Sequence, residues 1–322
     1  MKKVSVLVPI YGVEKYIERC ARSLFEQTYS DIEYIFVDDC SQDKSIDILH
    51  DVMADYPNRR VQTRIIQHKY NRGLAAARNT AVDASSGEYL MHIDSDDFLD
   101  LNAVEILVNK ANNTKADILI FGTRIIAKDG KRINNSPVYF DNKVAYIKSI
   151  LLHSTPASIW NKFYHAAFYK SSGIRSIDGV NYGEDYAVTP RLIYKACSIE
   201  TMDSSFYNYE LNNSNSYTNQ ISVNNIKELK LATEVLKKFF LNVEDKDKYY
   251  DAIQVIDVRS MLALLKKARK EMYGVIRKEF IQCINKKYNM LNNTDRLLLM
   301  LLRYRAFKII SILLTIHKSV YR

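Results

Sequence analysis

The chain has 322 residues, of which 47% are hydrophobic and 26% are charged, and its formal net charge is +9. This length is enough to bury the core of one large domain or two moderate ones. No uninterrupted apolar run reaches the roughly 18 residues that a membrane span requires. The sequence therefore predicts a globular protein that does not cross a bilayer.

The cysteines and the first residues indicate a cytoplasmic protein. Cys20, Cys40, Cys197 and Cys283 are scattered and form no Cys-x-x-Cys pair, a pattern typical of reduced thiols in a cytosolic protein. The chain starts directly with the apolar run Val4–Val8, which is too short for the core of a signal peptide and reads as a first strand.

The basic excess lies entirely in the last third of the chain. Residues 221–322 contain 21 Lys and Arg against 10 Asp and Glu, a net of +11, which leaves 25 against 27, or −2, for residues 1–220. We therefore expect two regions with different partners, with a boundary near residue 220.

Strand-like apolar runs alternate with helical patterns from residue 4 to residue 121. The expected strands are Val4–Val8, Ile32–Val37, Val61–Ile66, Tyr89–Ile93 and Ile118–Phe121, and the expected helices are Glu14–Gln27, Ser45–Tyr56, Gly73–Ala84 and Asn102–Asn112. This order predicts an α/β fold with a doubly wound, largely parallel sheet. Ligands of such sheets bind beyond the carboxyl ends of the strands.

Three carboxylates, Asp94, Asp96 and Asp97, directly follow the fourth expected strand. Like charges this close raise one another's pKa unless a cation lies among them. Asp-x-Asp with hard oxygen ligands suits Mg²⁺ or Mn²⁺ together with substrate phosphates. The alternative is a loop whose Asp and Ser side chains cap the next helix.

Polar motifs also follow the first three strands. Tyr11 follows the first strand, where it either lies beside a flat base or packs the loop, and Asp39 follows the second, where it is able to accept hydrogen bonds from a nucleobase or ribose. After the third strand, Gly73 allows a tight entry to a helix, and Arg78 lies one turn further on. Arg78 either contacts phosphate or base oxygens or lies on the helix surface.

Together these motifs resemble family 2 of the glycosyltransferases, inverting enzymes with the Rossmann-like GT-A fold. The resemblance covers about the first 210 residues. It rests on five motifs in order, which are Val8–Tyr11, Val37–Ser45, Asn71–Asn79, Gly87–Tyr89 and Asp94–Asp97. The family usually has Asn where Gly12 stands and Gly where Cys40 stands, and these departures concern the geometry of the two turns.

The resemblance implies a donor pocket for a nucleotide, commonly uridine. Its expected lining consists of Pro9, Tyr11, Asp39 and Arg78. Asp94 is then expected near the ribose, and Asp96 is the expected ligand of Mn²⁺ or Mg²⁺ on the diphosphate. A cation held there stabilises the departing nucleoside diphosphate.

The acceptor side is expected between residues 155 and 220. Trp160 and Lys162 match the acceptor-side Trp-x-Lys motif of the family, although core packing of the tryptophan is an alternative. Glu184 and Asp185 open the helix that runs to Lys195, where acids are favoured by the helix dipole alone. They also match the family's catalytic pair, so Asp185 is the expected general base.

The basic region 221–322 is expected to be helical. Its expected helices are Ile226–Leu241, Lys246–Lys270, Val275–Tyr288 and Asp295–His317. The last combines apolar runs with Arg and Lys, so residues 295–318 suit an anionic membrane surface, and packing on the chain's own domain or on a second copy is the alternative. Nucleic acid is a poorer partner, because the cations alternate with Leu and Ile.

The sequence thus predicts an inverting, metal-dependent glycosyltransferase that moves a sugar from a nucleotide-sugar, a UDP-sugar, to a saccharide or lipid-linked saccharide during surface polysaccharide assembly. It is expected in the cytoplasm or peripherally on the inner face of the membrane. The alternative is a catalytically silent nucleotide-sugar-binding or scaffold protein, which would have no use for Asp96 and Asp185.

Overall fold

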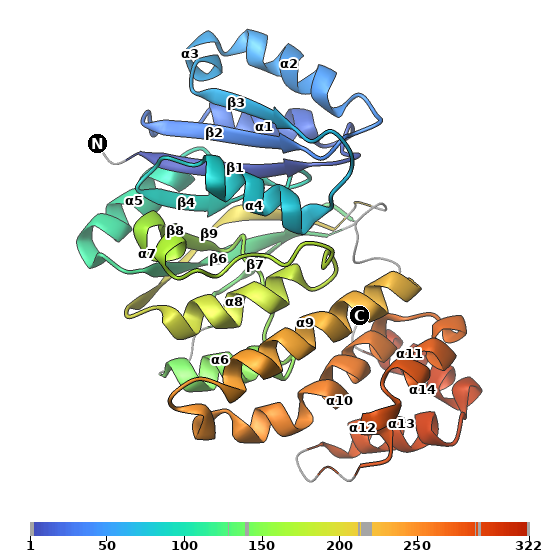
Figure 1. The fold of residues 1–322 in the computed structure, drawn as a ribbon. Helices are drawn as coiled ribbons and strands as arrows, with labels where there is room; N and C mark the ends of the chain where they lie inside the picture. Colours follow the sequence, from blue (N-terminus) through green and yellow to red (C-terminus); the bar gives the residue numbers. More distant parts are fainter. Residues whose placement is uncertain are drawn as a thin grey trace. The chain divides into compact units, whose positions relative to one another are not determined.

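The computed structural model describes residues 3–127, 129–138, 142–211, 213, 221–286, 288 and 291–320. It contains two compact units (Figure 1). The first comprises Met1–Asp141, Ser158–Gly179 and Arg191–Ser214, and the second comprises Asn142–Ala157, Val180–Pro190 and Asn215–Arg322. The second unit thus takes in two segments that precede the boundary expected near residue 220.

The first unit holds a nine-stranded sheet with the order β3-β2-β1-β4-β8-β6-β9-β5, and β7 pairs with β6. The strands are β1 (Val4–Ile10), β2 (Ile32–Asp38), β3 (Thr63–Gln67), β4 (Tyr89–His92), β5 (Phe98–Leu99), β6 (Ile118–Ile126), β7 (Arg132–Asn135), β8 (Lys162–His165) and β9 (Ile199–Glu210). The pairs among β3, β2, β1 and β4 are parallel, whereas β8 pairs antiparallel with both β4 and β6. The predicted doubly wound α/β fold is confirmed.

Helices cover the sheet of the first unit (Figure 1). They are α1 (Ile17–Phe25), α2 (Ser45–Asp55), α3 (Pro57–Arg60), α4 (Leu74–Ala84), α5 (Ala103–Thr114) and α7 (Ala166–Ser171). Every residue of β1 and β2 is buried, as expected for parallel strands that are covered on both faces. Helices α1, α2 and α5 share the main core with the sheet, and α4 packs on β1 and β2.

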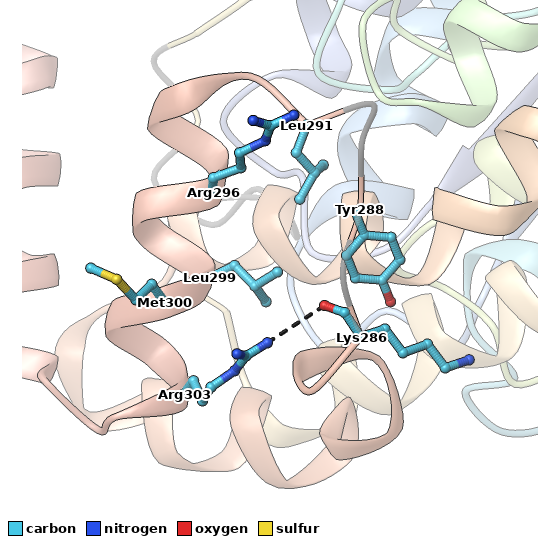
Figure 2. Close-up of a pocket in the computed structure, with 7 residues that line it drawn as sticks. All are labelled: Lys286, Tyr288, Leu291, Arg296, Leu299, Met300 and Arg303. Atoms are coloured by element: carbon cyan, nitrogen blue, oxygen red, sulfur yellow. Dashed lines mark hydrogen bonds between the residues drawn. The ribbon is translucent and has the colours of Figure 1, made fainter.

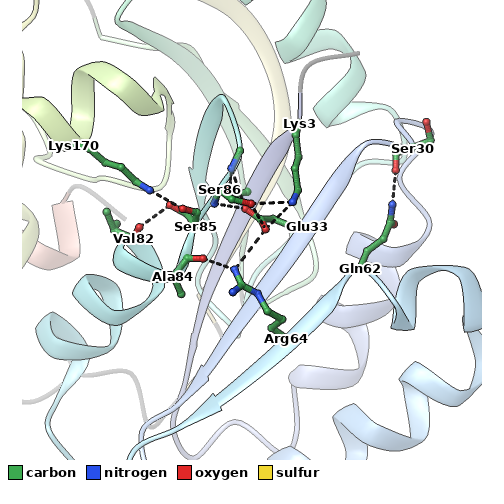
Figure 3. Close-up of polar contacts among 12 residues, drawn as sticks. Lys3, Ser30, Glu33, Gln62, Arg64, Val82, Ala84, Ser85, Ser86 and Lys170 are labelled. Atoms are coloured by element: carbon green, nitrogen blue, oxygen red, sulfur yellow. Dashed lines mark hydrogen bonds and ion pairs between the residues drawn. The ribbon is translucent and has the colours of Figure 1, made fainter.

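A buried carboxylate joins β1, β2 and the loop before β4 (Figure 3). Glu33 accepts hydrogen bonds from Ser5 Oγ at 2.5 Å, from Ser86 N at 2.6 Å and from Gly87 N at 3.0 Å, and Lys3 Nζ lies 3.0 Å away. Burial alone would raise the pKa of Glu33, but the bonds from Ser5, Ser86 and Lys3 outweigh it and lower the pKa to about 2. The cluster therefore stabilises the end of the sheet opposite the motifs described above.

The second unit is helical, as predicted. It contains α6 (Lys143–Leu151), α9 (Val223–Leu241), α10 (Tyr250–Lys267), α11 (Tyr273–Glu279), α12 (Ile281–Ile284), α13 (Asn293–Arg303) and α14 (Phe307–Val320), and helix α8 (Glu184–Lys195) is divided between the two units. Among the residues that the structure describes, no helix is both long and apolar enough to span a bilayer.

The last expected helix, Asp295–His317, is in fact two helices. Helix α13 ends before Tyr304, and Arg305 takes a left-handed φ of 58°, which a continuous helix does not allow. Helix α13 is held to α10 by Asp295, whose buried carboxylate contacts Arg259 at 2.6 Å and Lys266 at 2.8 Å. The chain therefore turns between two amphipathic helices.

Candidate active site

The predicted donor-site residues lie at or beyond the carboxyl ends of β1, β2, β3 and β4, which are parallel neighbours. Pro9 is buried in β1 opposite Val37 of β2. Tyr11, the second residue after it, is 54% exposed. Gly12 has a φ of 66°, a conformation that glycine adopts without strain, so the turn leaves the tyrosine ring accessible at this edge of the sheet.

Arg78 and Asp94 form a nearly buried ion pair in the first unit. Arg78 Nη2 lies 2.8 Å from Asp94 Oδ1, and the arginine side chain is 2% exposed. Helix α4 positions the arginine, because Gly73, with a φ of 89°, starts the helix one turn earlier. The alternative of a helix-surface arginine does not fit this burial. The backbone amide of Asp94 donates to Tyr207 Oη at 3.1 Å.

Asp97 is fully buried and links the Asp94–Asp97 turn to β9. It accepts hydrogen bonds from Tyr207 Oη at 2.7 Å and from the Glu210 amide at 2.8 Å. Burial and the neighbouring carboxylates of Asp96 and Asp94 raise its pKa well above the usual value. Asp97 thus fixes the turn in place through β9.

Asp96 is a partly buried carboxylate close to a second carboxylate, Asp94. Burial raises its pKa, and the nearby Asp94 carboxylate raises it further, while a hydrogen bond from Asn213 Nδ2 at 2.8 Å acts in the opposite direction. A divalent cation would remove this repulsion. Among the described residues no cluster of three or more His, Cys, Asp or Glu side chains is arranged to hold a metal. Mg²⁺ and Mn²⁺ fit nonetheless, because they are commonly held by one or two carboxylates and the substrate's phosphates.

Arg19 of α1 brings a cation to the same turn, and the sequence had given no sign of it. Its Nη1 lies 2.8 Å from Glu210 Oε2, and its Nη2 donates to the Asp96 carbonyl at 3.0 Å. The guanidinium carbon lies 4.3 Å from the centre of the Phe98 ring. Arg19 thereby connects α1, β9 and the turn that carries Asp96.

Asp39 is buried and holds the loop before α4. Its Oδ1 lies 2.7 Å from His68 Nδ1 and accepts from Arg72 N at 2.8 Å, and its Oδ2 accepts from Gly73 N at 2.7 Å. His68 also contacts Thr80 Oγ1 at 2.9 Å. No motif pointed to His68, because only the turn after β3 brings it to Asp39.

The turn after Asp39 contains a strained residue. Cys40 has a φ of 63°, which is unfavourable for a residue with a Cβ. The turn therefore keeps a left-handed conformation although cysteine stands where the family usually has glycine.

Trp160 lies two residues before β8 and Lys162 is the first residue of that strand, and both side chains contact protein groups. The indole stacks on Tyr207 with a centroid distance of 4.7 Å and on Tyr209 with one of 5.2 Å. Lys162 is fully buried, and its amine donates to Ser158 O at 2.5 Å and to Asn161 Oδ1 at 2.8 Å. Both side chains thus contact protein groups of the first unit.

Glu184 and Asp185 form the first turn of α8 in the second unit. Glu184 is buried and Asp185 is partly exposed. The preceding turn is fixed by Glu228 of α9, whose Oε2 accepts from Tyr182 N at 2.7 Å and from Asn181 N at 3.2 Å. The structure therefore gathers Pro9, Tyr11, Asp39, Arg78, Asp94 and Asp96 in one unit, and the Glu184–Asp185 pair belongs to the other.

The chain resembles proteins of known name in sequence and in fold. It is 30% identical over 216 residues to the uncharacterized glycosyltransferase EpsJ of Bacillus subtilis, an alignment that covers 65% of this chain and 61% of EpsJ. It is 36% identical over 145 residues to the chondroitin synthase of Escherichia coli, covering 44% of this chain and 20% of that protein. The chain thus spans no more than about three fifths of these relatives.

The solved structure of S. aureus TarS 1-349 in complex with UDP-GlcNAc has the same fold, with a TM-score of 0.72, 20% identity and coverage of 99% of this chain and 93% of that one. The mannosyltransferase PcManGT from Pyrobaculum calidifontis, solved with GDP-Man and Mn²⁺, matches with a TM-score of 0.55, 12% identity and coverage of 97% and 86%. The family model for glycosyl transferase family 2 matches residues 5–177. This match spans more than half of the sequence and contains all five sequence motifs, so the chain belongs to glycosyl transferase family 2.

Proposed function

We propose that the chain is an inverting glycosyltransferase that moves a sugar from a UDP-sugar to a hydroxyl of a saccharide or lipid-linked saccharide during surface polysaccharide assembly. Family membership supports sugar transfer. The fold shared with TarS, which was solved with UDP-GlcNAc and with UDP, supports a uridine donor. A matching relative, the poly(ribitol-phosphate) beta-glucosyltransferase of Bacillus spizizenii, supports a surface-polymer acceptor.

One observation carries this proposal. Asp96 is a partly buried carboxylate in the turn that follows β4, close to Asp94, and burial and the Asp94 charge raise its pKa. A divalent cation would reduce the repulsion between these carboxylates, and it would bind together with the diphosphate of the donor.

The donor is bound by residues of the first unit. Tyr11 offers its exposed ring to the uracil. Arg78 holds the Asp94 carboxylate in one orientation toward the ribose, and Asp39, through the loop at Gly73, holds the start of α4. Pro9 keeps the turn after β1 in place. The donor thus meets a site whose side chains are already oriented.

We propose Asp96 as the protein ligand of Mn²⁺ or Mg²⁺. The bound metal would neutralise charge on the departing diphosphate. Asn213, which donates to Asp96 Oδ2, orients the carboxylate for this role.

Asp185 is the proposed general base. Direct displacement at the anomeric carbon requires a group that takes the proton of the attacking hydroxyl, and a positioned carboxylate contributes about 10²–10⁴-fold. Glu184, Trp160 and Lys162 are proposed as acceptor-side residues. The contacts of Trp160 and Lys162 with the protein support a positioning role for these two.

Donor hydrolysis tests the proposal without knowledge of the acceptor. The full chain is incubated with a panel of UDP-, GDP- and dTDP-sugars with Mn²⁺, with Mg²⁺ or with EDTA, and release of the nucleoside diphosphate is measured. We expect slow, metal-dependent hydrolysis of one or a few UDP-sugars. Tight UDP binding without hydrolysis of any donor would instead favour a catalytically silent binding protein.

We also propose that residues 295–318 contact an anionic membrane surface, which would bring a lipid-linked acceptor near the enzyme. The exposed isoleucines of α14, which are Ile309, Ile312 and Ile316, support this contact. Vesicle binding of the chain with and without residues 295–322 tests it. A homodimer through the same helices is the competing outcome.

A further inference from the structure

The second unit contains a small pocket beside α13 (Figure 2). Its volume is about 270 Å³, and it is lined by Lys286, Tyr288, Leu291, Arg296, Leu299, Met300 and Arg303. This is just below the roughly 300–1,000 Å³ typical of sites for drug-sized ligands. The pocket therefore suits a small group.

The lining of the pocket is cationic on one part and apolar on another. Lys286, Arg296 and Arg303 each carry a positive charge, and none of the seven described lining residues carries a carboxylate. Leu299 and Met300 of α13 supply apolar surface between Arg296 and Arg303 (Figure 2). Such a lining fits a small anion that is joined to hydrocarbon.

Arg303 is fixed in place without losing its charge. It donates from Nη2 to Ile284 O at 2.7 Å and from Nε to the same oxygen at 3.2 Å. A weaker contact joins it to Lys286 O at 3.5 Å, as Figure 2 shows. Because carbonyl groups are neutral, these bonds hold the guanidinium while its net charge remains available to an anion.

The pocket adjoins an exposed apolar stripe. Leu297, Met300 and Tyr304 follow one another at helical spacing along α13 and its end, with side chains between 39% and 75% exposed. Met300 belongs both to this stripe and to the pocket. Helix α14, which packs on α13, repeats the spacing with three exposed isoleucines. An amphipathic helix with basic residues beside its apolar face is typical of the membrane interface.

We propose that this pocket binds the headgroup phosphate of an anionic membrane lipid while the stripe of α13 enters the interface. The partner is an anionic bilayer because the charge of the region is complementary to it: residues 269–322 contain 12 Lys and Arg against 3 Asp and Glu, and Asp295, one of these acids, is neutralised by Arg259 and Lys266. The inference extends the membrane contact proposed above and is independent of the transfer chemistry.

The test compares two charge-reversal variants of the full chain. Lys286→Glu with Arg296→Glu alters the pocket, and Lys227→Glu with Lys238→Glu makes the same change in net charge on exposed positions of α9. Binding is measured by co-sedimentation with vesicles of phosphatidylcholine alone and with 30% phosphatidylglycerol, a composition of about one anionic lipid in three. Each cation near an anionic surface is worth about 1 kcal/mol, so we expect the pocket variant to lose at least tenfold in binding to anionic vesicles and the α9 variant to lose much less.

Several results would overturn the proposal. They are equal losses in the two variants, equal binding to both kinds of vesicle, and binding of inorganic phosphate at this pocket without vesicle binding. A dimer that is dissociated by Met300→Ser with Tyr304→Ser would show that a second copy covers the stripe. Circular dichroism controls for folding. Donor hydrolysis is measured in parallel, and its absence from every variant and from the unaltered chain would count against the proposed transfer reaction alone.

Discussion

Arg19 and Glu210, which are 191 positions apart in the sequence, form an ion pair of 2.8 Å beside the turn that carries Asp96. Strand β9 supplies the carboxylate and helix α1 supplies the cation, so the ion pair joins these two elements beside the turn. Glu210 is 4% exposed at its side chain, and the Arg19 guanidinium compensates its negative charge.

The first prediction concerns this pair. Arg19→Met should lower the free energy of unfolding by about 1–3 kcal/mol, because it removes a cation that compensates the buried Glu210 carboxylate. Adding Glu210→Met should recover part of the loss. Urea denaturation of the two single variants and the double variant measures the coupling, and additive losses would contradict a direct interaction.

The second prediction concerns the proposed metal ligand. Asp96→Asn should weaken Mn²⁺-dependent UDP binding at least tenfold, as measured by calorimetry with and without EDTA. It should also raise the thermal midpoint of the metal-free chain, because an ionised carboxylate whose pKa is raised by burial destabilises the fold. Unchanged dependence of UDP binding on Mn²⁺ would remove Asp96 from this role.

The third prediction separates binding from chemistry. Asp185→Asn should leave UDP-sugar binding within about twofold and lower the transfer rate by about 10²–10⁴-fold, because a general base acts only on the attacking hydroxyl. Glu228→Gln serves as a comparison, since Glu228 holds the turn before α8 through two backbone amides. Normal turnover by the Asp185 variant would exclude it as the base.

The fourth prediction concerns acid stability. The pKa of Glu33 falls from 4.5 to about 2 on folding, so its contribution is complete above pH 4.5 and is lost as the pH falls from 4.5 toward 2. The shift corresponds to roughly 3 kcal/mol. Glu33→Gln should remove this pH dependence between pH 5 and pH 2.5, as followed by chemical denaturation at each pH. Parallel curves for the variant and the original chain would contradict the assignment.

The fifth prediction concerns the turn after β2. Cys40→Gly should stabilise the chain by about 0.5–1 kcal/mol, because glycine takes a φ of 63° without the steric cost of a Cβ. Cys40→Val, in which the side chain branches at Cβ, should destabilise the chain. Thermal denaturation of the three proteins checks the order, and a lower midpoint for the glycine variant would argue against strain at this position.

Sequence reasoning placed the strand-end residues well because they depend on local order. Asp39, Arg78, Asp94 and Asp96 each follow a strand of the parallel part of the sheet, and topology alone brings such ends to one edge. The chemical type of these side chains was then enough to suggest a diphosphate and a cation.

Residues that act across the fold were not predictable in this way. Arg19 reaches Glu210 from a helix face that looks merely amphipathic, and His68 reaches Asp39 only through the turn after β3. Lys162 was expected on the acceptor side next to Trp160, and its full burial by β8, which lies inside the sheet, did not follow from the motif. The break before Arg305 was missed because apolar spacing continues across it.

The three short contacts of Asp39 have a consequence for any attempt to change the base selectivity of the proposed donor site. A substitution of Asp39 would remove the hydrogen bonds that hold the loop at Gly73 and the start of the helix that carries Arg78. Any change in base selectivity would therefore be accompanied by a loss of affinity for the proposed donor. Tyr11 is 54% exposed, and it is therefore the better position for substitutions that are meant to change the proposed donor preference without disturbing the fold.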